Sequence, residues 1–332
     1  MVEDSYAVAG IGNAIVDVLA HADDARLAAL GLDKGVMTLI DAIDAEALYA
    51  KMGPGQECSG GSAANTIAGI AALGGRAAFI GKVGDDVLGQ VFRHDLSALG
   101  VHFPTIPAKA GRATARCLVF VTPDGHRTMQ TYLGACIDLA PEDVDEEAIA
   151  RARVTYLEGY LWDPPRAKEA FRKAARVAHE AGRQVALSLS DPFCVERHRA
   201  EFLDLVAQHV DILFANEVEI ASLFETDFDS AARAVKELCS TAVLTRSALG
   251  SVVVSGEQTV FQAAFPVERV VDTTGAGDLY AAGFLHGLTQ GFDLGHSAAL
   301  GSLCASEIIG HVGARPNADL ASLAVNAGLL SV

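Results

Sequence analysis

The sequence lacks the features that mark a secreted, membrane-spanning or zinc-binding protein. Its six cysteines are scattered without a Cys-x-x-Cys pair, and its ten histidines show no metal-ligand spacing. This pattern argues against a zinc site or a disulfide scaffold and is typical of a reducing compartment. No uncharged apolar run reaches the length of a membrane span, and the acidic residues 1–5 lack the basic region of a signal peptide. We therefore expect a cytoplasmic protein that does not enter the membrane.

Basic residues are also few. The chain has 25 Lys and Arg against 42 Asp and Glu, which gives a formal net charge of −17. A charge of this sign disfavours binding to nucleic acid or to anionic membrane surfaces. It does not exclude a small anionic ligand, because a local group of backbone N–H donors can override the global charge. We expect small-molecule partners.

Three familiar motifs are absent or broken. There is no GxxxxGK[ST] sequence, so the chain is not a P-loop enzyme, and no GxSxG elbow, which disfavours an α/β-hydrolase. Residues 10–12 begin like a dinucleotide fingerprint, but Ile15 stands at the third glycine and a second strand-like run follows. A nicotinamide-dependent oxidoreductase is therefore a weak alternative.

What the sequence does contain is a regular alternation of strand-like and helix-like segments. Apolar residues make up 51% of the 332 positions, enough for a large core. In the second half, strand-like runs lie at residues 154–157, 185–189, 210–214, 242–245 and 251–254, with helical segments between most of them. This alternation predicts an α/β fold with a mostly parallel sheet between two helix layers. Ligands then bind at the carboxyl ends of the strands, near Asp191, Asn216, Glu219 and the loop after Thr245.

Residues 114–133 break this rhythm. Residues 117–121 and 127–132 read as two strands joined by an Asp124-Gly125 turn, and residues 36–40 are a candidate third strand. A small sheet that projects from a large domain has the form of a lid. We expect one domain over residues 1–332, with a discontinuous β-sheet lid from about 14–40 and 104–135.

A glycine-rich turn precedes a helical segment near the end of the chain. Gly275, Ala276 and Gly277 form a turn almost without side chains, and Asp278 stands at its mouth. Backbone N–H groups at a helix start bind phosphate or a developing negative charge. Asp278 is then either a helix cap or a base that takes a proton from an attacking hydroxyl.

Other polar residues have two interpretations. Asn216 and Glu219 share a helix face and either hold Mg²⁺, often through water, or form a solvated first turn. Asp17, in an apolar run, is either a paired core residue or a ligand group. Ser62 is either a helix cap after Gly60-Gly61 or part of a site with Asn65, one turn further on. Arg127, at the hairpin, is either solvated or a phosphate contact.

Together these stretches resemble a known family. Residues 60–65 with 84–89, and residues 272–278, are similar to the two signatures of the ribokinase-type (PfkB) carbohydrate and nucleoside kinases, and residues 216–219 resemble that family's NxxE magnesium motif. The resemblance covers nearly the whole chain. Within the family, residues 12–17, 189–193, 210–217 and the hairpin at 125–127 are most similar to the adenosine kinases.

The resemblance implies a three-layer α/β/α ribokinase-like fold, ATP and Mg²⁺ as cofactors, and a role for each matching residue. In catalysis, Asp278 would deprotonate the acceptor hydroxyl, and the N–H groups of Gly275, Ala276 and Gly277 would stabilise the transferring phosphoryl group. In acceptor binding, Asp17, Gly61, Ser62 and Asn65 would hold the ribose, with Asn13 nearby, and Leu161, Trp162 and Met37 would contact the base. At the ATP end, Arg127 would close over the phosphates, and Asn216 and Glu219 would organise Mg²⁺. The nucleotide would be contacted by Thr245, Gly250 and Thr274. If the enzyme uses K⁺, Asp272 and Thr274 would hold it.

One position departs from the family pattern. Where the family has Thr-x-Gly-x-x-Gly, the chain has Ser247 at the first glycine. Serine disfavours positive φ, so we expect this loop to differ locally. The leading hypothesis is phosphorylation of a nucleoside 5′-hydroxyl, most consistent with adenosine. A ribose, fructose or keto-deoxy-gluconate kinase is the alternative, a non-catalytic nucleotide sensor is a third hypothesis, and both monomer and homodimer remain open.

Overall fold

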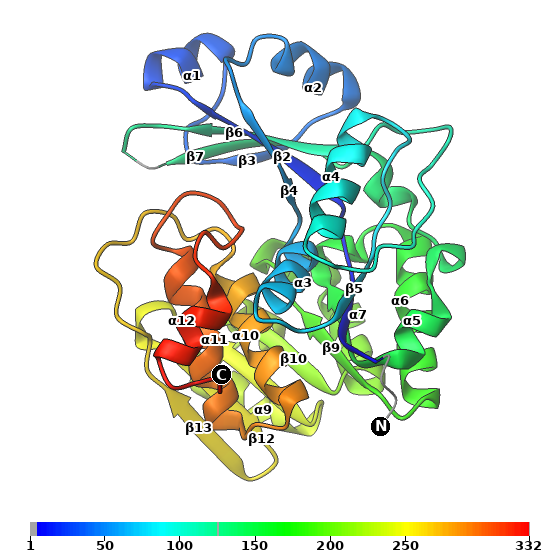
Figure 1. The fold of residues 1–332 in the computed structure, drawn as a ribbon, viewed down its shortest axis with the longest axis vertical. Coiled ribbons are helices and arrows are strands. Elements are labelled where there is room, and N and C mark those ends of the chain that lie inside the picture. The colour runs from blue at the N-terminus through cyan, green and yellow to red at the C-terminus, as the bar shows by residue number, and fades with distance from the viewer. Residues whose placement is uncertain (1–4, 125, 332) are drawn as a thin grey trace.

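The computed structural model describes residues 5–124 and 126–331. The acidic residues 1–4 and Gly125 of the predicted hairpin turn lie outside the described residues. Two sheets organise the molecule, a large one in the body and a small one above it (Figure 1). This is the mostly parallel sheet with a β-sheet lid that the sequence predicts.

The body sheet has eight strands in the order β13-β12-β11-β10-β9-β8-β1-β5. Neighbours from β5 to β11 are parallel, whereas β12 and β13 are antiparallel additions at one edge. Its strands are β1 (Tyr6–Ile11), β5 (Ala77–Ile80), β8 (Ala152–Glu158), β9 (Gln184–Ser188), β10 (Ile212–Asn216), β11 (Thr241–Thr245), β12 (Ser251–Ser255) and β13 (Gln258–Gln262).

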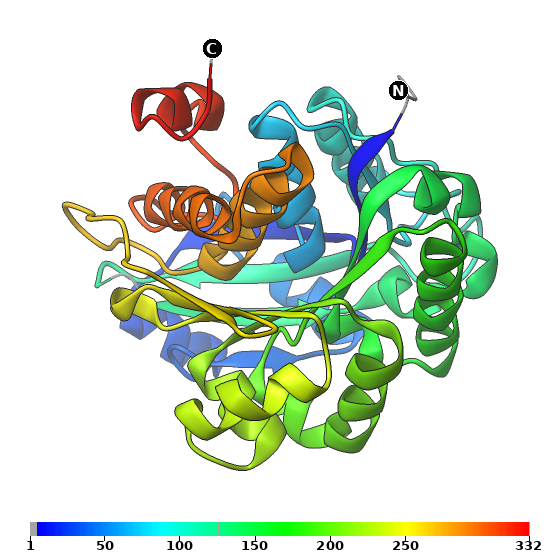
Figure 2. The same cartoon turned by 90° about the horizontal axis from the view of Figure 1, so that it is seen from below.

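Helices cover both faces of this sheet, which gives three layers (Figure 2). One layer contains α3 (Ser62–Ala72), α4 (Val87–Ala98), α10 (Ala276–Gln290), α11 (Leu294–Ile308) and α12 (Leu320–Asn326). The other contains α5 (Glu146–Arg151), α6 (Pro165–Glu180), α7 (Pro192–His209), α8 (Glu217–Phe224) and α9 (Phe228–Ala234).

The core divides by the alternation of side chains along the strands. In β10, Leu213 and Ala215 pack with one helix layer, while Ile212 and Phe214 pack with the other. Successive strand residues point to opposite faces, so a strand that is buried on both sides is apolar at nearly every position. Polar side chains therefore occur at the ends of the strands. Because neighbouring strands from β5 to β11 are parallel, their carboxyl ends lie on the same side of the sheet.

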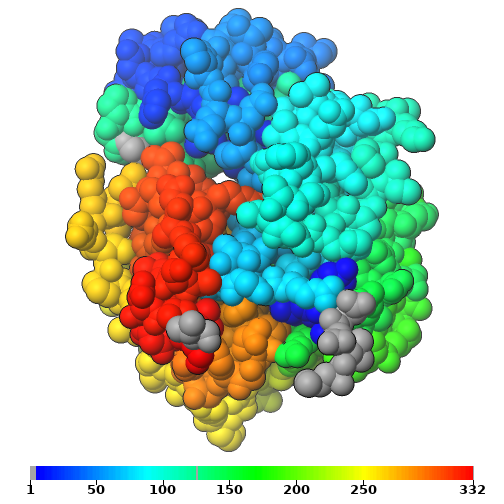
Figure 3. Space-filling model, viewed as in Figure 1, coloured from blue at the N-terminus to red at the C-terminus, as the bar shows by residue number. Residues whose placement is uncertain are grey.

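The lid is a five-stranded sheet in the order β3-β7-β6-β2-β4. Its strands are β2 (Ile15–His21), β3 (Met37–Leu39), β4 (Gln56–Gly60), β6 (Ala115–Val121) and β7 (Arg127–Tyr132), and α1 (Asp24–Leu30) and α2 (Ala42–Tyr49) cover its outer face. The predicted hairpin is confirmed as β6 and β7, and β3 pairs with β7. The predicted limit near residue 40 was wrong, because β4 pairs with β2 and extends the lid to Gly60. The space-filling view shows the blue lid seated above the body (Figure 3).

Among the described residues, no helix is both long and apolar enough to cross a membrane. All six cysteines are free thiols, as expected from their scattered positions.

Candidate active site

Two cavities meet at the start of α10, below the lid. The first, of about 410 Å³, lies between the lid residue Asp17 and the carboxyl ends of β8 to β11. The second, of about 700 Å³, lies between the loop after β11 and α11. Their linings share Asn216, Thr245, Thr273, Ala276, Gly277 and Tyr280. Two adjoining cavities with an anion-binding turn at their junction can hold two substrates with their reacting groups in contact.

Asp278 lines the first cavity next to this junction and does not cap a helix. The N-cap of α10 is Gly275, which has no side chain to cap the helix, and Asp278 lies inside the first turn. The carboxylate of Asp278 instead accepts hydrogen bonds from Ser62 Oγ (2.6 Å) and Asn65 Nδ2 (2.9 Å) of α3. Burial raises the pKa of Asp278 to about 6, against the effect of these two donors. Its carboxylate is thus oriented, and its pKa lies near the range in which a general base works well.

The backbone at the start of α10 supplies the donors. Gly275 has φ 78°, a conformation natural for glycine, and a Cβ there would lie 2.9 Å from that of Ala314. The first N–H groups of a helix have no partner inside the helix. The N–H of Ala276 bonds the Thr273 carbonyl at 3.2 Å, so the N–H groups of Gly275 and Gly277 are the ones placed to receive a phosphoryl group at the junction.

Asp17 projects from the lid into the first cavity. On the lid sheet it lies directly between Cys58 of β4 and Cys117 of β6. Gly60 leaves room for its carboxylate, since a Cβ there would lie 2.4 Å from Asp17 Oδ2. Burial raises the pKa of Asp17 to about 6. A half-buried carboxylate that lines a cavity is suited to accept hydrogen bonds from ligand hydroxyl groups. Among the described residues no ion pair or side-chain hydrogen bond engages Asp17, so the structure favours a ligand group over a paired core residue.

Arg127 reaches from β7 of the lid to the anion-binding turn. Its guanidinium forms an ion pair with Asp272 and donates to Thr274 Oγ1 at 3.1 Å. It is therefore not a solvated hairpin residue.

The same contacts decide whether Asp272 and Thr274 can hold a monovalent cation. The Asp272 carboxylate accepts from the backbone N–H of Thr274 (3.1 Å) and of Gly313 (3.0 Å), besides its ion pair with Arg127. The Ile309 carbonyl accepts from Val271 N at 2.8 Å. A guanidinium already neutralises this carboxylate, so these residues do not fit K⁺, and the structure does not support that expectation.

Asn216 and Glu219 line the first cavity at the start of α8. They form a reciprocal cap: Glu219 accepts from Asn216 N (2.9 Å) and Nδ2 (2.6 Å), and Asn216 Oδ1 accepts from two helix N–H groups. Burial raises the pKa of Glu219 to about 7. Each carboxylate oxygen keeps a further lone pair, so the pair fits a hydrated Mg²⁺ held through its water molecules.

The loop after β11 borders the second cavity. Thr245, Ser247 and Gly250 all line it, and Gly250 has φ 87° with no room for a Cβ. Ser247 adopts φ 49°, so the serine takes the left-handed conformation that the family's glycine would favour.

The structure does not place three predicted acceptor contacts in the lining of the first cavity. Leu161 and Trp162, in the 3₁₀ turn Gly159–Trp162, are 1% and 0% exposed and belong to the core. Trp162 packs against Phe171 and Phe202. Asn13 is also buried, and its Nδ2 donates to Glu158 Oε1 at 2.7 Å. Its side chain therefore bonds a buried carboxylate outside the cavity lining.

Tyr160, which is 40% exposed, lines the first cavity together with Phe214 and Tyr280. Met37 lies on β3 at the lid edge, outside the cavity lining, and its register partner Met129 lines the cavity instead. Tyr160 and Met129 therefore replace Trp162 and Met37 as candidate base contacts.

Sequence reasoning also missed Glu158, at the end of β8. Its carboxylate accepts from Asn13 Nδ2 and from Ala63 N (2.8 Å), which ties β1 to the start of α3. Burial raises the pKa of Glu158 to about 7. The sequence does mark Glu158 in one way, as a single acidic residue at the end of an apolar strand.

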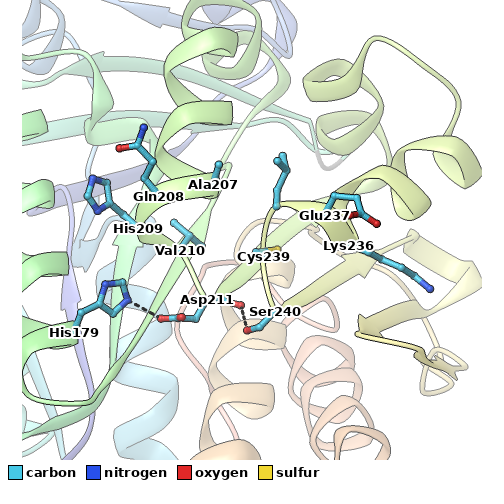
Figure 4. A pocket seen from close by; sticks show the side chains of 11 residues that line it. His179, Ala207, Gln208, His209, Val210, Asp211, Lys236, Glu237, Cys239 and Ser240 are labelled. Carbon is cyan, nitrogen blue, oxygen red and sulfur yellow. Dashed lines mark hydrogen bonds and ion pairs between the residues drawn. The ribbon is translucent and has the colours of Figure 1, made fainter.

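A separate hollow lies at the opposite edge of the sheet, where β9 to β11 begin (Figure 4). There, His179 Nε2 is 3.0 Å from Asp211 Oδ2, and Ser240 Oγ donates to the Asp211 carbonyl rather than to the histidine. Asp211 Oδ2 also accepts from Val185 N at 2.7 Å. These residues join strand ends and do not form a nucleophile–base pair.

The fold is ribokinase-like, and the chain belongs to the pfkB family of carbohydrate kinases, whose family model matches residues 37–320. A crystal structure of adenosine kinase from Sinorhizobium meliloti is 55% identical, with a TM-score of 0.91 over 98% of this chain and 100% of that one. A probable sugar kinase from Rhizobium etli CFN 42 is 50% identical, with a TM-score of 0.92 over 98% and 99%. An ATP-dependent ribose-1-phosphate kinase from Halopiger xanaduensis is 33% identical over 275 residues, 80% of this chain and 85% of that protein.

The chain is thus a phosphotransferase that acts on an alcohol group. Membership of this kinase family implies ATP as the phosphoryl donor and a small molecule as the acceptor. The relatives act on both nucleosides and sugars by name, so the acceptor is argued below.

Proposed function

We propose that this enzyme transfers the γ-phosphoryl group of MgATP to the 5′-hydroxyl of a nucleoside, and that the nucleoside is adenosine. The observation that carries the proposal is the position of Asp278, held by Ser62 and Asn65 next to the junction of two cavities and beside the N-terminus of α10. The six free thiols support action in the cytoplasm.

The chemistry divides between the two cavities. The acceptor lies in the first cavity, with its ribose hydroxyls against Asp17 and its 5′-hydroxyl toward Asp278. As the hydroxyl oxygen bonds to the γ-phosphorus, its proton passes to Asp278, and the bond to ADP breaks. The N–H groups of Gly275 and Gly277 receive the charge on the transferring group.

ATP lies in the second cavity, with Thr245, Gly250 and Thr274 near its phosphates. Arg127, paired with Asp272, borders the phosphate site from the lid side through its hydrogen bond to Thr274. Mg²⁺, held by Asn216 and Glu219 through water, would neutralise the phosphate charge when bound. Most of the rate then comes from positioning and electrostatic stabilisation, since the protein performs little covalent chemistry.

Adenosine is favoured over a free sugar because the first cavity has an apolar side. Tyr160 and Met129 line it beyond Asp17, and an aromatic ring and a thioether are good contacts for a flat base. The adenosine kinase from Sinorhizobium meliloti, at 55% identity, supports this choice.

The alternative is a sugar acceptor, and the ribose-1-phosphate kinase relative favours it. A sugar would use Asp17 and Asp278 in the same way but would leave Tyr160 and Met129 without a contact.

An ADP-release assay with MgATP tests the proposal against adenosine, guanosine, inosine, cytidine, ribose, ribose-1-phosphate, fructose and 2-keto-3-deoxygluconate. We expect the highest kcat/KM with adenosine. A preference for a free or phosphorylated sugar would refute the nucleoside assignment while retaining the role of Asp278.

A further inference from the structure

Arg315 lies in the loop after α11, and neither the sequence patterns nor the mechanism above uses it. Its guanidinium donates from Nε to the Ser59 carbonyl (3.0 Å), from Nη2 to Ser59 Oγ (3.0 Å) and from Nη1 to the Ala64 carbonyl (2.6 Å). All three acceptors are neutral. Arg315 therefore bridges Ser59 and Ala64, the two residues on either side of one turn.

That turn, residues 60–63, joins β4 of the lid to α3 of the body. Gly61 has φ 93°, and a Cβ there would lie 2.1 Å from the Asn13 carbonyl. The turn leads into Ser62 and Asn65, which orient the Asp278 carboxylate. Any movement of the start of α3 would therefore move both donors to Asp278.

The loop that carries Arg315 also supports the anion-binding turn. Gly313 N donates to Asp272 Oδ2 (3.0 Å), and Ala314 packs against Gly275. Residues 313–315 thus contact the start of α10 with one end and the start of α3 with the other. The same short loop therefore contacts both the helix that orients the proposed base and the turn that receives the phosphoryl group.

The charge of Arg315 has a second consequence. Its positive charge lowers the pKa of Asp17 and of Asp278, against the burial that raises both. The other charged and titratable groups that face these two carboxylates are Arg127, Cys58, Cys117, Tyr156, Glu158, Tyr160 and Glu219. Arg127 is already ion-paired with Asp272, so Arg315 is the cation whose charge both acceptor-site carboxylates share.

We propose that Arg315 is a positioning residue of the acceptor site, which holds the turn of residues 60–63 against the start of α10 and offsets the charge of Asp17 and Asp278. The proposal rests on the role of Asp278 as the base but not on adenosine as the acceptor. It is tested with whichever acceptor the wild-type enzyme phosphorylates.

The experiment compares Arg315→Met and Arg315→Lys by the pH profile of kcat. Arg315→Met removes the bridge and the charge, so we expect kcat to fall roughly ten- to a hundredfold and the acid limb of the profile to move upward by about half a pH unit or more. Arg315→Lys keeps the charge, but one ammonium cannot bridge Ser59 and Ala64. It should therefore retain the wild-type acid limb with a reduced kcat.

The matched control is Arg166→Met on α6, where an exposed arginine pairs with Glu142; it should leave kcat and the pH profile unchanged. Wild-type kcat and acid limb in Arg315→Met would overturn the proposal. If Arg315→Met does not fold, a wild-type kcat in Arg315→Lys overturns it, because the bridge is then dispensable. Asp278→Asn in the same series separates the two hypotheses: if that variant keeps wild-type turnover, the proposed base is wrong, whatever Arg315 does.

Discussion

Asp278→Asn should make the enzyme inactive and more stable at the same time. The substitution removes the proposed proton acceptor, and loss of a general base costs about 10²–10⁴-fold in kcat. It also removes a carboxylate that is ionised in a buried position. The structure therefore predicts opposite effects on turnover and on the free energy of unfolding.

The size of the stability gain follows from the pKa. Raising the pKa of the carboxyl from 3.8 to about 6 costs about 3 kcal/mol when the group is ionised. The native carboxylate has two hydrogen bonds that an amide replaces imperfectly, so we expect a gain of about 1–2 kcal/mol above pH 7. Because the folded pKa lies above the unfolded value, the cost is absent below pH 3.8, grows as the pH rises to about 6 and is constant above that.

Urea unfolding of both proteins between pH 4.5 and 8, together with turnover at pH 8, measures these effects. Asp17, Glu158 and Glu219 also have raised pKa values, to which the charge of Asp278 contributes, so removal of that charge lowers the cost of ionising them and adds to the gain. Asp33→Asn, at an exposed position, is the control and should change neither property. The reasoning is refuted if Asp278→Asn retains turnover within a few-fold of wild type, or if its stability difference does not grow with pH.

Three further predictions concern binding and backbone strain. Asp17→Ala should raise the acceptor KM roughly ten- to a hundredfold with a smaller change in kcat, since it removes hydrogen bonds to a charged group; an unchanged KM would exclude Asp17 from the site. Tyr160→Ala should raise the KM for adenosine by about tenfold and leave turnover of any accepted free sugar unaffected, whereas equal effects on both would argue against a base contact. Ser247→Gly should change the free energy of unfolding by between zero and about +1 kcal/mol, because relief of left-handed strain is partly offset by the greater freedom of the unfolded chain; chemical denaturation that shows a loss above about 1 kcal/mol would contradict the strain.

The fold was predictable because the strands are apolar on both faces and alternate with helices. β4 was missed, since Gln56–Gly60 has no apolar alternation, and its place in the lid depends on pairing with β2.

The candidate site was predictable where a motif is contiguous, as at residues 272–278. The error over Trp162 has a geometric cause. A 3₁₀ turn rotates about 120° per residue, so Tyr160 faces the cavity while Trp162, two residues later, faces the core. Sequence alone does not show which of three neighbouring large residues faces the ligand.

Arg315 could not be predicted for a different reason. Its partners Ser59 and Ala64 lie 256 and 251 positions away along the chain, and no local pattern marks an arginine in a loop. Such a contact appears only when the two ends of the chain are brought together.

The glycines beside the site make some positions without chemistry the most sensitive to substitution. A methyl group at Gly12 would lie 2.2 Å from Glu158 Oε2, and one at Gly61 would lie 2.1 Å from the Asn13 carbonyl. Gly53, in the loop after α2, has no atom within 4 Å of such a methyl group. In a saturation library of this gene, alanine at Gly12 or Gly61 should therefore be depleted as strongly as substitutions of Asp278. Gly12 and Gly61 should therefore vary as little among natural sequences as the proposed base Asp278, although neither glycine takes part in proton transfer.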